Sequence, residues 1–350
     1  MLDLDDEDAL LAADPGEMLD AFASMPEQLE RSYRSVAERR DLPEGFSSVM
    51  FCGMGGSASA ADLVTALLSP AATTPLTLHR GATLPAWVGK ETLVVAISYS
   101  GGTEETIGCL GEALSRGCPA VAIAGGGELL ETAVNAGAAA IRIEADAPMP
   151  RAALGDLGGS VLGLVNATGI DRVDQDQVTA SVRELRDTAA RLAPARPSGS
   201  NEAKQLARWL GDLVPVIWGT EGLAEPVAMR WKAAFNENAK LPAFASSLPE
   251  LAHHEVVGWT RSASDRFAVL ALRGGDESER AQERLAAAFS ILEDAGIAHR
   301  EISVPPASPP LARSMGLALV GDLASTYHAL GRGIDPAPID AIHRLKGRLK

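Results

Sequence analysis

Short apolar runs alternate with amphipathic segments along most of the chain. The runs at 48–52 and 92–97 read SVMFC and TLVVAI, and each precedes a polar turn and then a segment with apolar residues at helical spacing. Strands joined through helices in this way are typical of βαβ units with parallel strands. Further strands are expected at residues 74–79, 120–124, 138–143, 214–219, 267–272 and 301–304.

The strand and helix alternation occurs twice. A helical arm over 1–45 precedes the first series, and the mostly helical stretch 151–212 separates the two. Within that stretch, ARPSGSNEAK (195–204) has a linker-like composition, and Ser200 is the expected N-cap of the helix that follows. We predict an α/β fold of two tandem doubly wound domains, residues 1–168 and 169–350, each a mainly parallel sheet flanked by helices.

Composition and charge limit the possible partners. The formal net charge is −15, which disfavours general binding of nucleic acids. A small phosphorylated ligand remains possible, because main-chain amides at a helix N-terminus can hold a phosphate. The acidic N-terminus and the absence of an apolar run of ~20 residues indicate a cytoplasmic protein with no membrane contact. The three cysteines form no CxxC pair, so neither a disulfide framework nor a cysteine-rich metal site is expected.

A glycine-rich loop, Gly53–Ser59, follows the first predicted strand and opens a helix. Gly55 and Gly56 would let a ligand approach the backbone, and Ser57 adds a hydroxyl. The loop lacks the third glycine of a dinucleotide-binding turn and the Gly-Lys-Ser/Thr of a P-loop. A plain tight turn is the alternative interpretation.

A second loop, Ser98–Thr106, follows the strand at 92–97. Ser98, Ser100 and Thr103 place three hydroxyls beside two glycines, which suits a phosphate bound by side chains and amides together. The alternative is a helix cap, with Thr103 paired to Thr106 or Ser100 paired to Thr103. A cap requires only one of these hydroxyls, so the pattern favours a phosphate-binding loop.

The second loop resembles the S-x-S-G-x-T-x-E/D-T motif of the sugar isomerase (SIS) domain, and G-M-G-G-S at 53–57 resembles its companion loop. In that superfamily the Ser/Thr-rich loop wraps the phosphate of a phosphosugar. NENAKLPA at 236–243 and PELAHHE at 249–255 are similar to motifs of the bifunctional phosphoglucose/phosphomannose isomerases, and the similarity extends to 342–346. The resemblance implies two SIS-type domains and a phosphate site formed by Gly55, Gly56, Ser57, Ser98, Ser100 and Thr103.

Four side chains suit aldose–ketose interconversion, which needs ring opening, proton transfer between C2 and C1, and stabilisation of an enediolate. Glu237 suits the proton transfer, and His253 suits ring opening because imidazole exchanges protons near neutral pH. Arg151 is a permanent cation for the enediolate, and Lys346 could assist ring opening. The resemblance assigns the same roles to these positions. His254 is an alternative to His253.

Each of these residues also has an ordinary structural interpretation. Glu237 could be a solvated charge, Arg151 a helix cap or an ion-pair partner, and Lys346 a surface residue of a basic tail. Adjacent histidines diverge and rarely hold one ion, and the chain has no HExxH motif, so no metal site is expected.

The resemblance implies isomerisation of glucose 6-phosphate, mannose 6-phosphate or both to fructose 6-phosphate through a cis-enediol, with no metal or cofactor. It also implies a homodimer in which His253 is contributed across the interface. Two alternatives remain open at this point: a catalytically weak phosphosugar-binding sensor or regulator, and another SIS enzyme acting on a different sugar phosphate.

Overall fold

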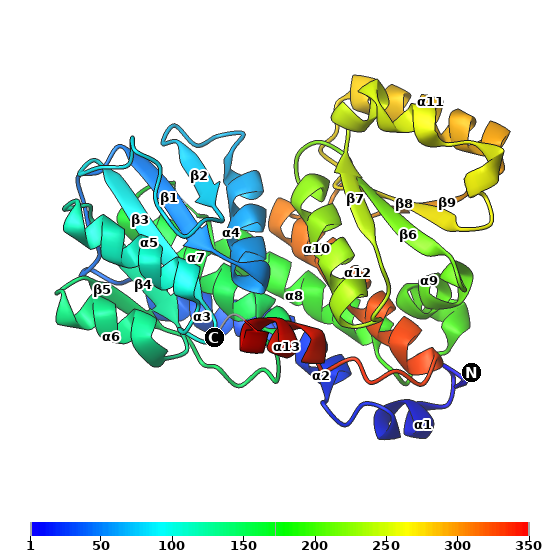
Figure 1. Cartoon of the computed structure of the whole chain (residues 1–350), viewed down its shortest axis with the longest axis horizontal. Coiled ribbons are helices and arrows are strands. Elements are labelled where there is room, and N and C mark those ends of the chain that lie inside the picture. Colours follow the sequence, from blue (N-terminus) through cyan, green and yellow to red (C-terminus); the bar gives the residue numbers. More distant parts are fainter. Residues whose placement is uncertain (1, 172, 349–350) are drawn as a thin grey trace.

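The computed structural model describes residues 2–171 and 173–348 and shows two α/β units side by side (Figure 1). Residues 1, 172, 349 and 350 fall within the two expected domains but lie outside the described residues. Each unit contains one sheet, and every strand pair in both sheets is parallel. The strands are β1 (Ser48–Gly53), β2 (Leu76–His79), β3 (Thr92–Ser98), β4 (Ala120–Ala124), β5 (Ala139–Arg142), β6 (Val214–Gly219), β7 (Phe244–Ser247), β8 (Phe267–Arg273) and β9 (Ala298–Ser303).

The two sheets repeat one topology. The first has the order β2-β1-β3-β4-β5, and the second has the order β7-β6-β8-β9. In such open sheets ligands bind beyond the carboxyl ends of the strands where the strand order reverses, which in the first sheet is at β1 and β3. The predicted α/β class with two doubly wound sheets is confirmed.

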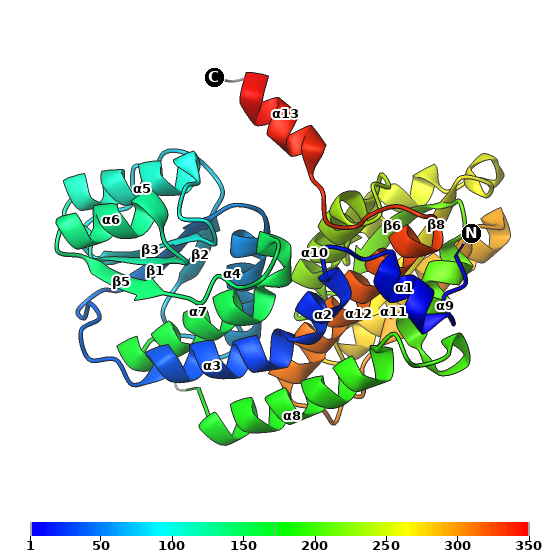
Figure 2. The same cartoon turned by 90° about the horizontal axis from the view of Figure 1, so that it is seen from below.

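Helices cover both faces of the first sheet. In Figure 2, α5 and α6 lie on one side of it, and α3 and α7 lie on the other. The helices are α1 (Glu7–Ala12), α2 (Met18–Ala23), α3 (Met25–Ala37), α4 (Gly55–Leu68), α5 (Glu104–Ser115), α6 (Gly127–Asn135), α7 (Leu154–Thr168), α8 (Gln175–Leu192), α9 (Glu202–Leu210), α10 (Ala224–Glu237), α11 (Glu279–Ala295), α12 (Pro310–Gly331) and α13 (Asp340–Arg348).

Small residues set the packing of α7 against α3. Gly155, Gly159 and Gly163 recur every fourth position on one face of α7, and a Cβ at Gly155 would lie 2.3 Å from the Met25 carbonyl oxygen. The two backbones therefore approach as closely as they do because this face of α7 has no side chains. The helical arm is thereby fixed to the first unit.

The segment with a linker-like composition, 195–204, is exposed at most positions but anchored by a few buried side chains. Lys204 is fully buried and donates hydrogen bonds to the carbonyls of Pro194 and Arg196, at 2.6 and 2.8 Å. The N-cap of α9 is Asn201, whose side chain accepts from the Lys204 amide, and not Ser200. These hydrogen bonds form only in the folded chain, so the composition of the segment does not reveal them.

Helix α8 connects the two units by packing on α3 and on the long buried helix α12. The predicted domain boundary at 168/169 lies between α7 and α8 and stays a prediction. In the described residues, no helix combines the length and hydrophobicity that crossing a bilayer requires.

Candidate active site

The glycine-rich loop after β1 forms the first turn of α4, which begins at Gly55. Gly55 has a φ of 52°, a conformation that favours glycine. A Cβ at Gly56 would lie 3.1 Å from the Pro150 carbonyl oxygen and 3.3 Å from Arg151 Cα. The N-terminus of α4 therefore lies directly against the segment that carries Arg151.

The loop after β3 is tied together by its own hydroxyls. The hydroxyls of Ser98 and Thr103 are 2.9 Å apart, and Ser98 Oγ accepts from the Gly101 amide at 3.1 Å. Ser100 Oγ accepts from the Gly102 amide at 3.3 Å. Thr103 occupies the N-cap position of α5 but, among the described residues, no side chain caps this helix. The capping box considered from the sequence is absent there, so the first-turn amides face outward without a side-chain acceptor.

The two loops are in contact with each other. The Tyr99 amide donates to Ser57 Oγ at 3.1 Å, which connects the second loop to the first turn of α4. Ser57 and Ser98 are buried, whereas Gly55 and Ser100 are exposed. The structure thus brings all six predicted phosphate-binding residues to one edge of the first sheet, between the N-termini of α4 and α5. An anion at this edge would meet two helix N-termini.

Arg151, in the short 3-10 helix Pro150–Ala152, is only 6% exposed. Its Nη1 lies 3.3 Å from Oε2 of Glu237, which is the last residue of α10. Its Nε donates to Asn238 Oδ1 at 2.6 Å. Nη2 donates to the carbonyls of Pro336 and Ala337, at 2.7 and 3.0 Å. Residues far apart in the sequence therefore hold one guanidinium beside one carboxylate.

Charges behind this pair are neutralised inside the protein. Arg230 donates to Asp322 Oδ2 from Nε and Nη2, at 3.1 and 2.6 Å, and Nη2 also donates to the Arg151 carbonyl at 2.8 Å. Burial raises the pKa of Asp322, and the Arg230 guanidinium opposes that rise. Burial also lowers the pKa of Arg151, which the Glu237 carboxylate opposes. Arginine nevertheless keeps its proton in proteins, so Arg151 is a fixed cation.

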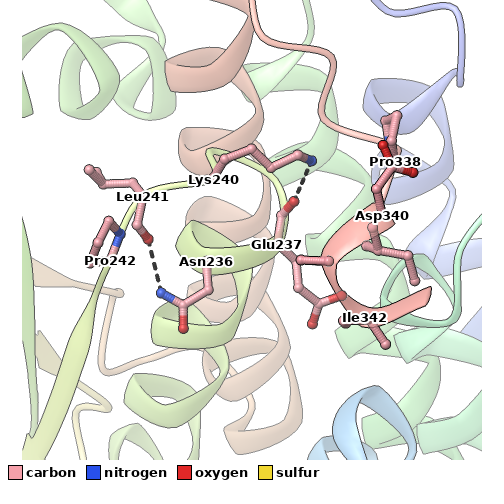
Figure 3. A pocket seen from close by; sticks show the side chains of 10 residues that line it. Asn236, Glu237, Lys240, Leu241, Pro242, Pro338, Asp340 and Ile342 are labelled. Atoms are coloured by element: carbon pink, nitrogen blue, oxygen red, sulfur yellow. Dashed lines mark hydrogen bonds between the residues drawn. The ribbon is translucent and has the colours of Figure 1, made fainter. Parts of the chain in front are cut away.

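A cleft of about 550 Å³ opens beside Glu237 (Figure 3). Lys240 spans one wall and donates to the carbonyls of Glu237 and Pro336, at 2.6 and 2.9 Å. Burial, and then the neighbouring charge of Arg151, lower the pKa of Lys240. The residues lining the cleft are Asn236, Glu237, Lys240, Leu241, Pro242, Pro338, Ile339, Asp340, Ala341 and Ile342.

The chain is similar to known proteins over nearly its whole length. It is 32% identical to a bifunctional phosphoglucose/phosphomannose isomerase of Caldicellulosiruptor bescii, over 95% of this chain and 98% of that one. It is also 32% identical to the protein of the same name from Aquifex aeolicus, over 87% and 91%. The chain belongs to the bifunctional phosphoglucose/phosphomannose isomerase family. Like those relatives, it is an isomerase.

Two further comparisons agree with this assignment. Residues 199–349 match the family described as bacterial phospho-glucose isomerase C-terminal SIS domain. The fold is similar to the crystal structure of a hypothetical protein from Thermus thermophilus, with a TM-score of 0.72 at 18% identity, over 98% of this chain and 92% of that one. The second similarity concerns the fold alone.

The structure does not bring the other two predicted catalytic residues of this isomerase to Glu237 within one chain. His253 ends the 3-10 helix Glu250–His253 and is exposed, as is its neighbour His254. Lys346 is exposed on α13, which extends away from both units (Figure 2). Within the described part of the chain, neither His253 nor Lys346 forms a hydrogen bond or an ion pair with Glu237 or Arg151.

Sequence reasoning missed the residues that support the site. Asn238 and Lys240 stand in the same motif as Glu237 but received no role. Arg230 lies on the buried face of α10, where a charged residue is unusual and signals a partner. That partner, Asp322, lies on α12 and had no recognisable motif around it.

The second sheet fills its own equivalent edge with carboxylates. Glu277, which is 8% exposed, accepts from the Thr220 hydroxyl at 2.8 Å and from the Gly275 amide at 3.1 Å. Asp276 Oδ2 accepts from the Leu223 amide at 3.2 Å. Donors that could have met a phosphate are already satisfied there by protein oxygens. At this edge the Thr220 hydroxyl and the Leu223 and Gly275 amides thus already have carboxylate acceptors.

Proposed function

We propose that this isomerase interconverts glucose 6-phosphate, mannose 6-phosphate or both with fructose 6-phosphate through a cis-enediol, with Glu237 as the base. The observation that carries the proposal is the Arg151–Glu237 pair, 3.3 Å apart, next to the first turn of α4. A phosphate at that turn would anchor a sugar so that its other end reaches the pair. The names of the two relatives support the choice of hexose 6-phosphates.

In the proposed reaction the phosphate binds Gly55, Gly56, Ser57, Ser98, Ser100 and Thr103. The Glu237 carboxylate removes the proton from C2 of the open-chain aldose, which leaves an enediolate whose charge Arg151 stabilises. The same proton returns to C1 while the hydroxyl proton on O2 passes to O1, which yields the ketose. Rotation about C2–C3 in the intermediate would let both epimers react at one base.

Ring opening precedes this transfer and is assigned to His253 and Lys346. Because His253 is exposed and forms no contact with Glu237 in its own chain, we propose a homodimer in which His253 reaches the active site of the partner subunit. The proposed reaction needs neither a metal nor a cofactor, since the acid, the bases and the cation are all side chains. Cys52, Cys109 and Cys118 are free thiols, which suits the proposed cytoplasmic location.

A direct assay tests the proposal. The purified chain is incubated with each hexose 6-phosphate in the presence of EDTA, and fructose 6-phosphate is measured. We expect turnover with at least one sugar. Measurable binding without turnover of either sugar would contradict the isomerase and favour a phosphosugar sensor.

Glu237→Gln tests the base, with Glu279→Gln as the control at an exposed carboxylate on α11. We expect Glu237→Gln to lower kcat by about 10²-fold or more, because the amide cannot accept the proton. Glu279→Gln should keep wild-type kcat. Full activity in Glu237→Gln would remove Glu237 from the mechanism while leaving the reaction itself intact.

A further inference from the structure

The orientation of the Arg151 guanidinium is fixed by protein acceptors at Nε and Nη2. A guanidinium has five N–H groups. The Nε hydrogen is used by Asn238, and Nη2 is used by the carbonyls of Pro336 and Ala337. Nη1 contacts Glu237, and among the described residues its second N–H is left without an acceptor. Nη1 is therefore the edge that remains for a substrate oxygen.

The Asn238 side chain is itself fixed by a second hydrogen bond, to Ser325. It is fully buried at the C-cap of α10, and its Nδ2 donates to Ser325 Oγ at 2.9 Å. Ser325 Oγ in turn donates to the Asp322 carbonyl at 2.9 Å. These two bonds determine which amide atom faces Arg151, because Nδ2 is occupied by Ser325 and only Oδ1 is free to accept from Nε.

The hydrogen bonds close into a ring. Asp322 accepts from Arg230, and Arg230 Nη2 donates to the carbonyl of Arg151 at 2.8 Å. The side chain of Arg151 is thus fixed through Asn238, and its main chain is fixed through Arg230. The ring joins the 3-10 helix at 150–152 with α10 and α12, so it ties the first unit to the second at the active site.

We propose that Asn238 is a positioning residue that holds the Arg151 guanidinium with its Nη1 edge toward Glu237. The consequence for turnover rests on the proposed function, in which Arg151 stabilises the enediolate. Among the described residues the Asn238 side chain hydrogen-bonds Arg151 and Ser325 alone, so it acts on the reaction through Arg151. Its loss should affect the transition state more than the binding of the phosphate.

Asn238→Leu is the first test, because leucine has a similar size and no hydrogen-bonding group. We expect kcat to fall on the order of 10²-fold, as for a catalytic group displaced by about 1 Å. KM should stay within about threefold. The matched control is Asn201→Leu, another fully buried asparagine, which caps α9 and has no bond to the ring. It should lower stability and leave kcat per folded protein unchanged.

A double-mutant cycle that combines Asn238→Leu with Arg151→Lys distinguishes an effect of Asn238 on the position of Arg151 from a general effect on the fold. If Asn238 acts through Arg151, Asn238→Leu should have little further effect once Arg151 is lysine. Should Asn238→Leu fail to fold, Ser325→Ala replaces it in the cycle, with an expected fall in kcat of about threefold to tenfold. Effects on kcat that multiply independently would overturn the proposal.

Solvent exchange of the Arg151 Nε–H, measured by ¹⁵N NMR, reports on the hydrogen bond between Arg151 Nε and Asn238 Oδ1. This measurement does not require catalytic activity. The signal is assigned by its loss in Arg151→Lys, and we expect its exchange to be slow in the wild type and fast in Asn238→Leu. Unchanged exchange in Asn238→Leu would overturn the proposal. If the wild type isomerises no hexose 6-phosphate, the proposed function fails, and the Nε–H exchange still decides whether Asn238 holds Arg151.

Discussion

The loop after β3 contains two adjacent glycines whose surroundings differ sharply. Gly101 has a φ of 68°, and a Cβ there would lie 1.7 Å from the Gly126 carbonyl oxygen. Real Cβ atoms do not come closer than 3.0 Å to another heavy atom. Either the loop after β3 or the loop after β4, which carries Gly126, must therefore move by more than an ångström. At Gly102 the nearest atom to a Cβ is Ser100 Oγ at 4.0 Å, and its φ lies outside the left-handed region.

We expect Gly101→Ala to damage phosphate binding and Gly102→Ala to be tolerated. The left-handed backbone alone costs alanine about 1–2 kcal/mol. The displacement also pulls apart the bonds of Ser98 Oγ to Gly101 and Thr103. Loss of one charge-assisted hydrogen bond to phosphate, worth about 1.5–3 kcal/mol, corresponds to an increase in KM of roughly 10-fold to 150-fold.

The assay measures KM for a hexose 6-phosphate, with inhibition by inorganic phosphate as a second readout that does not need the sugar. Thermal unfolding of both variants shows whether the difference comes from the loop or from loss of the fold. Equal KM values in the two variants, or a normal KM in Gly101→Ala, would refute the assignment of this loop to the phosphate.

Three further outcomes are expected. Calorimetric titration with fructose 6-phosphate should give one site per chain, since Asp276 and Glu277 occupy the equivalent edge of the second sheet; two equal sites would contradict this interpretation. Equal amounts of Glu237→Gln and His253→Ala, each nearly inactive, should regain about a quarter of wild-type activity after subunit exchange, because half the dimers are mixed and each has one complete site. No recovery would place both residues in one subunit. Burial lowers the pKa of Lys204 below its usual 10.5, so the unfolded chain binds this proton more tightly and stability rises with pH across that interval. Urea unfolding over this alkaline range should show a smaller rise for Lys204→Met than for the wild type.

Most strands could be predicted because each is an apolar run between turns. The predicted ranges for β4 and β6, Ala120–Ala124 and Val214–Gly219, match the structure in full. Strand β7 (Phe244–Ser247) was missed because it is short and half of its residues are serines. It lies at the edge of the second sheet and pairs only with β6. Its place in the sheet depends on that pairing and not on its own hydrophobicity.

The candidate site also contains features that the sequence predicts and features that it does not. The Gly/Ser/Thr loops and the NEN motif were visible because their residues are neighbours in the sequence. Their meeting with Arg151 was not visible, because that residue contacts Asn238 and the 336–337 carbonyls across 87 and 185 or more residues. The NEN motif predicted a catalytic function for Glu237 and no function for Asn238.

The sequence by itself determined that this chain forms two parallel β-sheets flanked by helices. It also determined that loops suited to phosphate follow β1 and β3. Local patterns suffice for this, because apolar periodicity and turn residues act over a few positions. Only the tertiary structure decided that Arg151 faces Glu237, that a buried ring fixes its orientation, and that His253 lies apart from it. Those relations depend on hydrogen bonds between distant segments, whose geometry is set when the helices pack.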